Sequence, residues 1–282
     1  MTGKPAAPAF VATRCAPARI HLRHIEQITE RLSARDKDII DDIHRLRLVT
    51  GAQLERLHFT DLSPASRGRT RRRVLHRLVS WRVLATLPRR VGGVRAGSNG
   101  LIYHLDTTGA WLMRLQALAH GHNAPRRPTT PSAGLTAHIL AVSELYVQLA
   151  EHARTSGFQV ATFQAEPACW WPDDLGGHLK PDAYALLAAH GYQDAWWIEA
   201  DRGTEHRPAL QRKLMSYLDF AHRGGIGPTS VLPRVLFTTP TQQRGATLTA
   251  LITALPPPAK QLFHVAPHDA AADLLVTTLT QP

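Results

Sequence analysis

Residues 62–105 contain ten arginines and no aspartate or glutamate, and this block constrains the chain more than any other feature. The formal net charge of the whole chain is +11 at pH 7, so about ten of these charges lie in the block. A solvated helix face would carry interspersed charges of both signs, whereas this block carries one sign. The simplest explanation is a surface that binds a polyanion, and we expect nucleic acid.

The local pattern predicts which elements carry this charge. Ser33 is placed to cap an amphipathic helix, and Thr50-Gly51 ends that helix. A short second helix is expected over 52–59, and Pro64 opens a third that runs to about residue 81. On a helical wheel, basic residues share one arc of the third helix, opposite an apolar arc. The basic arc contains Arg69, Arg72, Arg73, His76 and Arg77.

Two strand-like segments follow, over 83–91 and 101–105, joined by a glycine-rich turn. Two helices, a basic helix and a basic hairpin follow one another in the order of a winged helix-turn-helix. We expect the third helix to enter the major groove of double-stranded DNA and the hairpin to contact the backbone or minor groove. The alternative is a winged helix that mediates protein contacts. The predicted DNA-binding residues are Arg67, Arg69, Arg72, Arg73, Arg77, Arg89, Arg90 and Arg95.

The chain divides into four expected segments. They are a flexible tail (1–30), a DNA-binding domain (31–119), a linker (120–134) and a second domain (135–282). The linker is rich in proline and glycine, and its His120 and His122 are expected to be solvated rather than to bind metal. The two cysteines are far apart and suit a reducing compartment. Neither a signal peptide nor a membrane span is evident, so we expect a cytoplasmic protein without a membrane partner.

The second half alternates helical and strand-like segments, which favours an α+β fold for the chain. Helices are expected over 135–154, 208–222 and 241–255, and strands over 158–165, 181–187, 195–200, 234–239 and 262–265. The core order is therefore αβββαβ. Adjacent strand residues face opposite sides, so one tryptophan of each pair, 170–171 and 196–197, is expected in the core.

Three carboxylates fall at the ends of the expected strands. Asp182 begins the second strand, and Glu199 and Asp201 end the third on one face, because strand residues two apart point the same way. Converging carboxylates favour Mg²⁺ or Mn²⁺, which can activate water against a phosphodiester. The alternative is that Glu199, Asp201 and Glu205 only form ion pairs at a strand-to-helix turn and that Asp182 is a turn residue. Their partners would then be arginines such as Arg202, Arg207 and Arg212.

This arrangement resembles the PD-(D/E)xK nuclease superfamily, whose restriction-endonuclease-like core has the same αβββαβ order. The resemblance implies that Glu144 is the helix carboxylate, Asp182 the Pro-Asp residue and Glu199 the acid of the third strand. Asp201 stands where that superfamily has its lysine. Lys213 on the following helix, with Tyr217 on the same helix face, or Lys180 would then supply the amine. The implied catalytic residues are Glu144, Asp182, Glu199, Asp201 and Lys213, with Asp182, Glu199 and Asp201 as metal ligands.

The string Ile198-Glu199-Ala200-Asp201-Arg202-Gly203-Thr204-Glu205, after a winged helix and a proline-rich linker, resembles the replication-relaxation proteins of bacterial plasmids and integrative elements. The resemblance implies a DNA-binding accessory protein of plasmid replication, relaxation or mobilisation, whose nuclease-like domain need not be active. Two alternatives stay open: a metal-dependent endonuclease or nickase, and a module that recruits a replication or mobilisation enzyme. A homodimer that reads paired half-sites is compatible with each of them.

Overall fold

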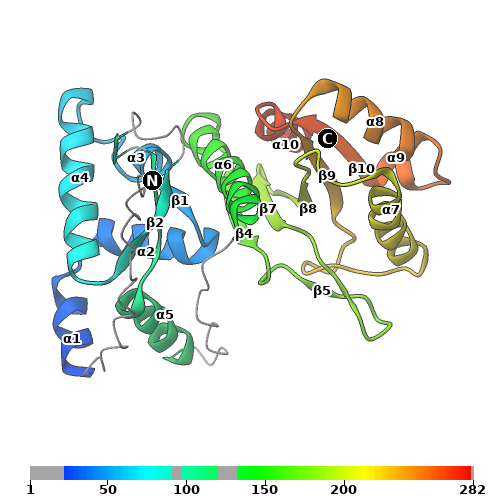
Figure 1. Cartoon of the computed structure of the whole chain (residues 1–282). Helices are drawn as coiled ribbons and strands as arrows, with labels where there is room; N and C mark the ends of the chain where they lie inside the picture. The colour runs from blue at the N-terminus through cyan, green and yellow to red at the C-terminus, as the bar shows by residue number, and fades with distance from the viewer. Residues whose placement is uncertain (1–21, 91–96, 99, 120–131, 281–282) are drawn as a thin grey trace, which may run out of the picture.

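The computed structural model describes residues 22–90, 97–98, 100–119 and 132–280 and shows a mixed α+β protein (Figure 1). Its N-terminal part consists of helices α1 to α5 and a small antiparallel sheet with strand order β1-β3-β2. The helices are α1 (Leu22–Arg31), α2 (Ala34–Leu46), α3 (Gly51–His58), α4 (Pro64–Ser80) and α5 (Thr107–Ala119). The strands are β1 (Val49–Thr50), β2 (Leu84–Arg90) and β3 (Leu101–Leu105).

Side-chain caps explain where two of these helices begin. Ser33 and Asp36 form a reciprocal capping box at the start of α2, which confirms the predicted N-cap. Thr50 and Gln53 form a second capping box at the start of α3, directly after the predicted break. Each box satisfies backbone N–H groups that have no partner inside the helix.

The expected flexible tail is wrong over residues 22–30, because these residues form most of α1. Ile25 and Ile28 are each only 2% exposed, and α1 contacts α5. Two apolar residues three positions apart lie on one helix face, and their burial accounts for the order of this segment. Residues 1–21 of the tail and residues 120–131 of the linker lie outside the described residues.

The C-terminal part contains the expected αβββαβ order as α6, β4, β7, β8, α7 and β9. A small hairpin, β5–β6, is inserted after β4, and further elements follow β9. The helices are α6 (Ala133–Ser156), α7 (Arg207–His222), α8 (Gln242–Thr253), α9 (Ala259–Leu262) and α10 (Ala271–Thr280). The strands are β4 (Gln159–Ala165), β5 (Trp171–Pro172), β6 (His178–Leu179), β7 (Ala183–Ala189), β8 (Tyr192–Ala200), β9 (Arg234–Thr239) and β10 (Phe263–Pro267).

The five-stranded sheet has the order β10-β9-β8-β7-β4 and is covered by helices on both faces (Figure 1). Strands β8, β9 and β10 are parallel, and β4, β7 and β8 pair antiparallel. Trp196 packs with the α6 and α10 side, and Trp197 packs with α7 and α8 on the other side. Both side chains are fully buried, so neither member of this pair is available to stack on a nucleobase.

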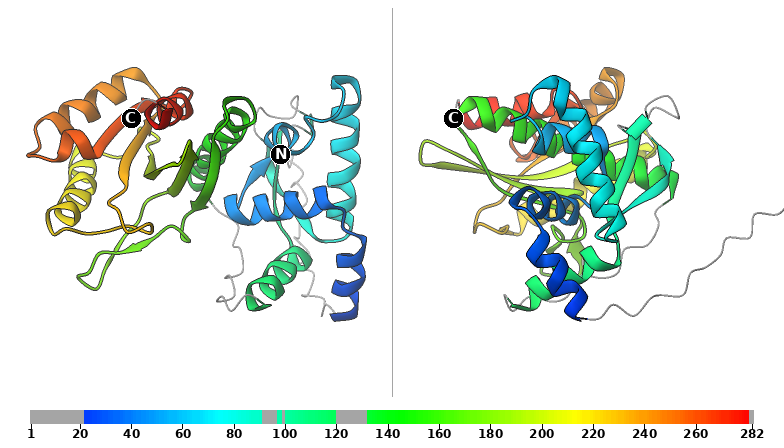
Figure 2. Two further views of the ribbon diagram at one scale, coloured as in Figure 1. Left: turned by 180° about the vertical axis from the view of Figure 1, so that it is seen from behind. Right: turned by 90° about the vertical axis from the view of Figure 1, so that its left-hand side faces the viewer.

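Helix α6 lies between the two parts of the molecule (Figures 1 and 2). It contacts α2, α3 and β1 on one side and β4, β8 and α10 on the other. Ser143, fully buried within α6, donates a hydrogen bond to the Leu48 carbonyl in the N-terminal part (2.7 Å). Within the described residues α6 is the one helix long and apolar enough to cross a membrane, but this central packing accounts for its apolar residues.

Candidate functional site

The outer face of α4 carries an exposed basic surface, which we call the α4 basic face. Arg69, Arg72 and Arg73 are exposed and make no hydrogen bond or ion pair with any residue that the structure describes. His76, also exposed, extends the same face. Helix α4 lies at the end of the molecule remote from the C-terminal part, so solvent reaches this face freely (Figures 1 and 2).

Other arginines of α4 are held within the protein. One amino group of Arg77 lies 2.6 Å from both carboxylate oxygens of the fully buried Asp36. Arg67 donates to the backbone carbonyls of Thr60 and Leu62 at 3.3 and 3.2 Å. Both arginines belong to the predicted DNA-binding set, but the structure gives each a stabilising contact inside the N-terminal part.

Arg71 is 1% exposed and belongs to the core rather than to the surface. It pairs with Glu55 at 3.0 Å and donates to Ser98 at 3.1 Å. Burial lowers the pKa of Arg71, and Glu55 opposes that effect. Of the other predicted contacts, Arg89 and Arg90 belong to β2 but their side chains are not described, and Arg95 lies outside the described residues.

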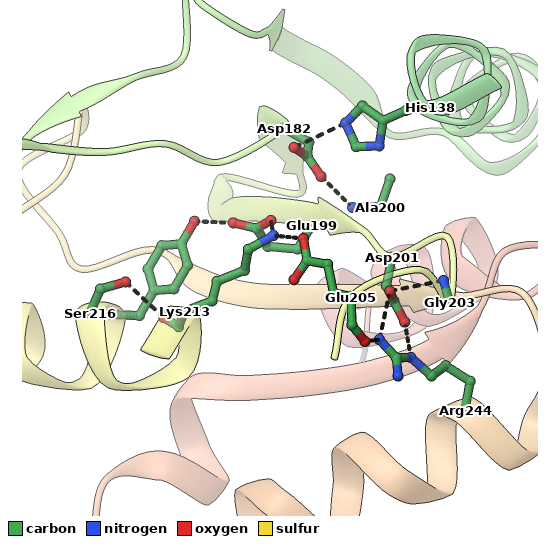
Figure 3. Close-up of polar contacts among 11 residues, drawn as sticks. His138, Asp182, Glu199, Ala200, Asp201, Gly203, Glu205, Lys213, Ser216 and Arg244 are labelled. Carbon is green, nitrogen blue, oxygen red and sulfur yellow. Dashed lines mark hydrogen bonds and ion pairs between the residues drawn. The ribbon is translucent and has the colours of Figure 1, made fainter. Parts of the chain in front are cut away.

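The second candidate site lies at the end of β8 and is centred on Glu199, which is 2% exposed (Figure 3). Both of its carboxylate oxygens are occupied by residues of α7. The Tyr217 hydroxyl donates to Oε1 at 2.6 Å, and Lys213 donates to Oε2 at 2.8 Å. Lys213 and Tyr217, which are four residues apart on one face of α7, therefore both contact Glu199. Burial raises the pKa of Glu199, Asp182 raises it further, and Lys213 opposes both effects.

Lys213 links Glu199 to Glu205, whose Oε1 accepts a second hydrogen bond at 3.0 Å. Burial alone would lower the pKa of Lys213, but the surrounding carboxylates outweigh burial and raise it. Burial and the neighbouring Glu199 also raise the pKa of the Tyr217 hydroxyl. The 2.8 Å contact with Glu199 and the neighbouring carboxylates therefore hold Lys213 in its ammonium form.

Asp182 lies just before β7, beside the end of β8, with both oxygens engaged (Figure 3). Oδ2 accepts from the Ala200 backbone N–H at 2.7 Å, and Oδ1 lies 3.1 Å from His138 Nε2. The contact with Asp182 raises the pKa of His138 above its ordinary value, although burial acts in the opposite direction. His138 comes from α6 and joins the site without having been predicted.

Asp201 follows β8 on the same side as Glu199, as the strand period predicts, yet it has a separate partner. Arg244 of α8 holds it through two nitrogens at 2.5 and 3.1 Å. The Gly203 N–H donates to Asp201 at 3.0 Å and closes a tight turn, in which Gly203 has a φ of 73°. Glycine adopts this left-handed conformation without steric cost. The turn and the arginine fix the carboxylate away from Glu199.

Glu144 does not join this site, contrary to the role that the resemblance implied. It faces α3, where it accepts from Gln53 at 2.9 Å and from Arg56 at 2.5 Å. The physical reason is helical rotation: six residues separate His138 from Glu144, which turns the side chain by about 240° around α6. The α6 residue that reaches Asp182 is therefore His138. Lys180 is also absent from the site, because its ammonium lies 5.0 Å from the exposed Trp170 ring.

The predicted metal ligands do not converge on one point. Asp182, Glu199 and Asp201 each direct their oxygens to different hydrogen-bond donors. Across residues 22–280, within the described ranges, no group of three or more His, Cys, Asp or Glu side chains is arranged to hold a metal ion. Octahedral Mg²⁺ requires several oxygens around one centre. As arranged, these carboxylates do not fit that requirement and instead form ion pairs and backbone hydrogen bonds.

The alternative that these acids form ion pairs is confirmed for Glu199, Asp201 and Glu205, but the partners it named are wrong. The cations are Lys213 and Arg244 rather than Arg202, Arg207 or Arg212. Lys213 was accessible to prediction, because it and Tyr217 are four residues apart on one helix face. Arg244 is 43 residues from Asp201 in the chain, and no spacing in the sequence signals that contact.

The fold and these sites define an α+β protein that joins a part with a basic exposed helix to a five-stranded sheet with a buried, ion-paired carboxylate centre. The family model for replication-relaxation matches residues 40–235, well over half of the chain. The chain therefore belongs to the replication-relaxation family, and this membership suggests a role related to plasmid replication. No curated protein matches the chain.

Proposed function

We propose that this protein binds double-stranded DNA through the α4 basic face and acts as a DNA-binding accessory protein of plasmid or mobile-element replication. The observation that carries the proposal is the exposure of Arg69, Arg72 and Arg73 without internal partners. Clustered guanidinium groups attract phosphates, and they are more weakly hydrated than ammonium groups, so less bound water has to be removed when they bind.

The arrangement of the N-terminal part supports this proposal. Elements α2, β1, α3, α4, β2 and β3 follow one another as in a winged helix, with the sheet order β1-β3-β2. In that fold α4 would be the recognition helix in the major groove, and the β2–β3 hairpin would contact the backbone. Arg72 or Arg73 would read guanine edges, while the remaining arginines would bind phosphates. The internal contacts of Arg71 and Arg77 would hold the helix in place.

The C-terminal part would then serve mainly as a scaffold. We propose a PD-(D/E)xK-like fold for this part, which is supported by its αβββαβ order and by the proximity of Asp182, Glu199 and Lys213. Its carboxylates are neutralised by the protein's own donors, so this part can hold its shape without a metal ion.

The test is fluorescence anisotropy with a labelled duplex over a series of salt concentrations. The Arg72→Ala/Arg73→Ala variant removes two exposed charges and no internal contact. Each lost phosphate contact lowers the slope of log K against log salt by about 0.9, so we expect a slope smaller by about 2 and binding at least about tenfold weaker. Lys260→Ala, an exposed charge on α9, is the control and should bind like the wild type. Equal binding by the double variant and the control would refute the proposal.

One observation favours a second candidate, a metal-dependent DNA endonuclease or nickase. Lys213 reaches Glu199 from the following helix, as expected for a lysine displaced from the third strand. Activity with Mg²⁺ or Mn²⁺ would require Glu199 to leave Lys213 and Tyr217, because the present donor set does not fit a metal ion. The assay is nicking of supercoiled plasmid with Mg²⁺, Mn²⁺ or EDTA, beside Glu199→Ala/Asp201→Ala. Metal-dependent nicking that the variant loses would establish this function, and its absence across metals would exclude it.

A further inference from the structure

A pocket of about 480 Å³ lies between α6 and the carboxyl ends of the parallel strands β8, β9 and β10. Arg202 follows β8, Thr238 is near the end of β9, and His268 follows β10. Thr50 and Gln53 line the pocket from the N-terminal part. In open α/β sheets ligands bind outside the carboxyl ends of parallel strands, and small-molecule sites favour the junction between two parts of a protein. The position and volume of the pocket are therefore those of a small-molecule site.

The α6 wall of this pocket is largely apolar. It is formed by Ala137, Leu140, Ala141 and Leu145, whose spacing places them on one face of the helix. Ala137 and Ala141 are one turn apart and only half-buried. Their small side chains leave room for a flat ring to lie against the helix.

The strand side of the pocket carries an arginine with unused donors. Arg202 is exposed and makes no hydrogen bond or ion pair with any residue that the structure describes. Burial lowers the pKa of the His268 imidazole, and the charge of Arg202 lowers it further, which places the guanidinium near this wall. The loop is held by the preceding Asp201, which is bonded to Arg244 and to the Gly203 N–H (Figure 3). A guanidinium on a fixed loop can bind two oxygens of a phosphate group.

Two carboxylates also line the pocket, and their surroundings differ. Glu144 already accepts hydrogen bonds from Gln53 and Arg56. Asp269 is exposed, and its carboxylate accepts no hydrogen bond from the residues that the structure describes. Its oxygens can therefore accept a hydrogen bond from a ligand, whereas they would repel a small inorganic anion. A ligand that fits the whole pocket has an anionic group for Arg202, a hydrogen-bond donor for Asp269 and a flat ring for α6.

We propose that this pocket binds a nucleoside monophosphate group, with the phosphate on Arg202, the amino group of the base on Asp269 and the base ring against Ala137 and Ala141. The same group occurs in a free nucleotide and at the 5′ end of a DNA strand, and the experiment separates these two sources. The proposal does not rest on the proposed function, because every contact that it names lies outside α4.

The test is isothermal titration calorimetry of the full chain with deoxyadenosine 5′-monophosphate (dAMP). Arg202→Ala removes the phosphate contact and no internal contact, so we expect binding to be at least about tenfold weaker. Asp269→Ala should also weaken binding, because it removes the acceptor for the base. Ala137→Phe should block binding without a change in charge, because its ring fills the space beside α6. Arg207→Ala, which removes an exposed arginine outside the pocket lining, is the matched control and should bind dAMP like the wild type.

Comparison ligands show which part of the nucleotide is bound. Deoxyadenosine, which lacks the phosphate, and inorganic phosphate, which lacks the base, should each bind more weakly than dAMP. The proposal is wrong if the wild type does not bind dAMP, if Arg202→Ala binds it as well as Arg207→Ala does, or if either fragment binds as tightly. Tighter binding of phenylalanine, which also carries an anionic group, a donor and a ring, would overturn the assignment to nucleotides.

Two further arms identify the source of the nucleotide and separate this proposal from the proposed function. A 5′-phosphorylated single strand that displaces dAMP would identify strand ends as the ligand, and failure to displace it would identify free nucleotides. Arg72→Ala/Arg73→Ala should bind dAMP like the wild type even though it loses duplex binding. If this variant loses dAMP as well, the nucleotide binds at α4 and the pocket assignment is wrong.

Discussion

Replacing Lys213 with methionine would show whether the buried carboxylate of Glu199 depends on its neighbouring cation. Glu199 is 2% exposed, and its Oε2 is bonded to the Lys213 ammonium at 2.8 Å. An unpaired buried carboxylate costs several kcal/mol, so without the ammonium group the folded protein should hold Glu199 as the neutral acid. The Tyr217 hydroxyl at 2.6 Å can still donate to the protonated group.

The magnitude follows from the pKa of Glu199, which burial raises to about 8 in the wild type although Lys213 opposes the effect. Removing Lys213 raises this pKa further, so the variant must hold the proton at pH values where the wild type releases it. At pH 9, about one pH unit above the wild-type pKa, this lowers the free energy of unfolding by about 1.4 kcal/mol. Because both proteins hold the proton at pH 7, the pH-dependent loss should be close to zero there.

The assay is equilibrium urea unfolding, followed by circular dichroism at pH 7 and pH 9. Glu199→Gln in the Lys213→Met background removes the ionisable group, so this double variant should recover most of the lost stability and show no difference between the two pH values. Lys260→Met, which changes an exposed lysine, controls for the substitution itself. An equal loss at both pH values, or no recovery in the double variant, would refute the ion-pair interpretation.

Three further predictions follow from other contacts. Asp36→Ala removes the capping box of α2 and the partner of Arg77. The free energy of unfolding, measured by urea unfolding, should fall by about 2–3 kcal/mol. A loss of less than about 1 kcal/mol would contradict this prediction. Arg56→Ala breaks two ion pairs between α3 and α6, whose side chains are about one-third exposed. The free energy of unfolding, measured by thermal unfolding, should therefore fall by only about 1 kcal/mol. An unchanged midpoint would show that these pairs contribute nothing to stability. The contact with Asp182 raises the pKa of His138, so protonated His138 stabilises the fold at low pH and this stabilisation is lost as pH rises through that pKa. His138→Gln should therefore destabilise the protein more at pH 5.5 than at pH 8.5, and equal losses would argue against the pair.

Strong periodic patterns made most of the elements predictable. The apolar run at 234–239 is β9, and the capped amphipathic stretch after Ser33 is α2. The elements that were missed are short or depend on packing. Strands β5 and β6 have two residues each, and α1 is ordered by contacts with α5, which lies about 80 residues further along the chain. Such contacts leave no period in the sequence.

The sequence predicted which residues belong to the candidate sites better than it predicted the contacts that these residues make. A helical wheel places Arg72 and Arg77 on one basic arc, but it does not show that Asp36 lies opposite Arg77. Likewise, the strand period brings Glu199 and Asp201 to one side of the sheet without revealing that Arg244 separates them. Long-range partners decide which charges remain free, and a local pattern contains no information about them.

The packing of α6 fixes the N-terminal part relative to the five-stranded sheet. Buried side chains of α2, α6 and the five-stranded sheet, among them Ile43, Leu145 and Trp196, belong to one continuous hydrophobic core. Arg154 adds hydrogen bonds from α6 to the last carbonyls of α3, at Arg56 and Leu57. The segment 120–134 therefore separates two parts of the sequence whose cores are joined in space. A DNA segment on α4 would then lie in a fixed orientation to the five-stranded sheet and its buried carboxylates.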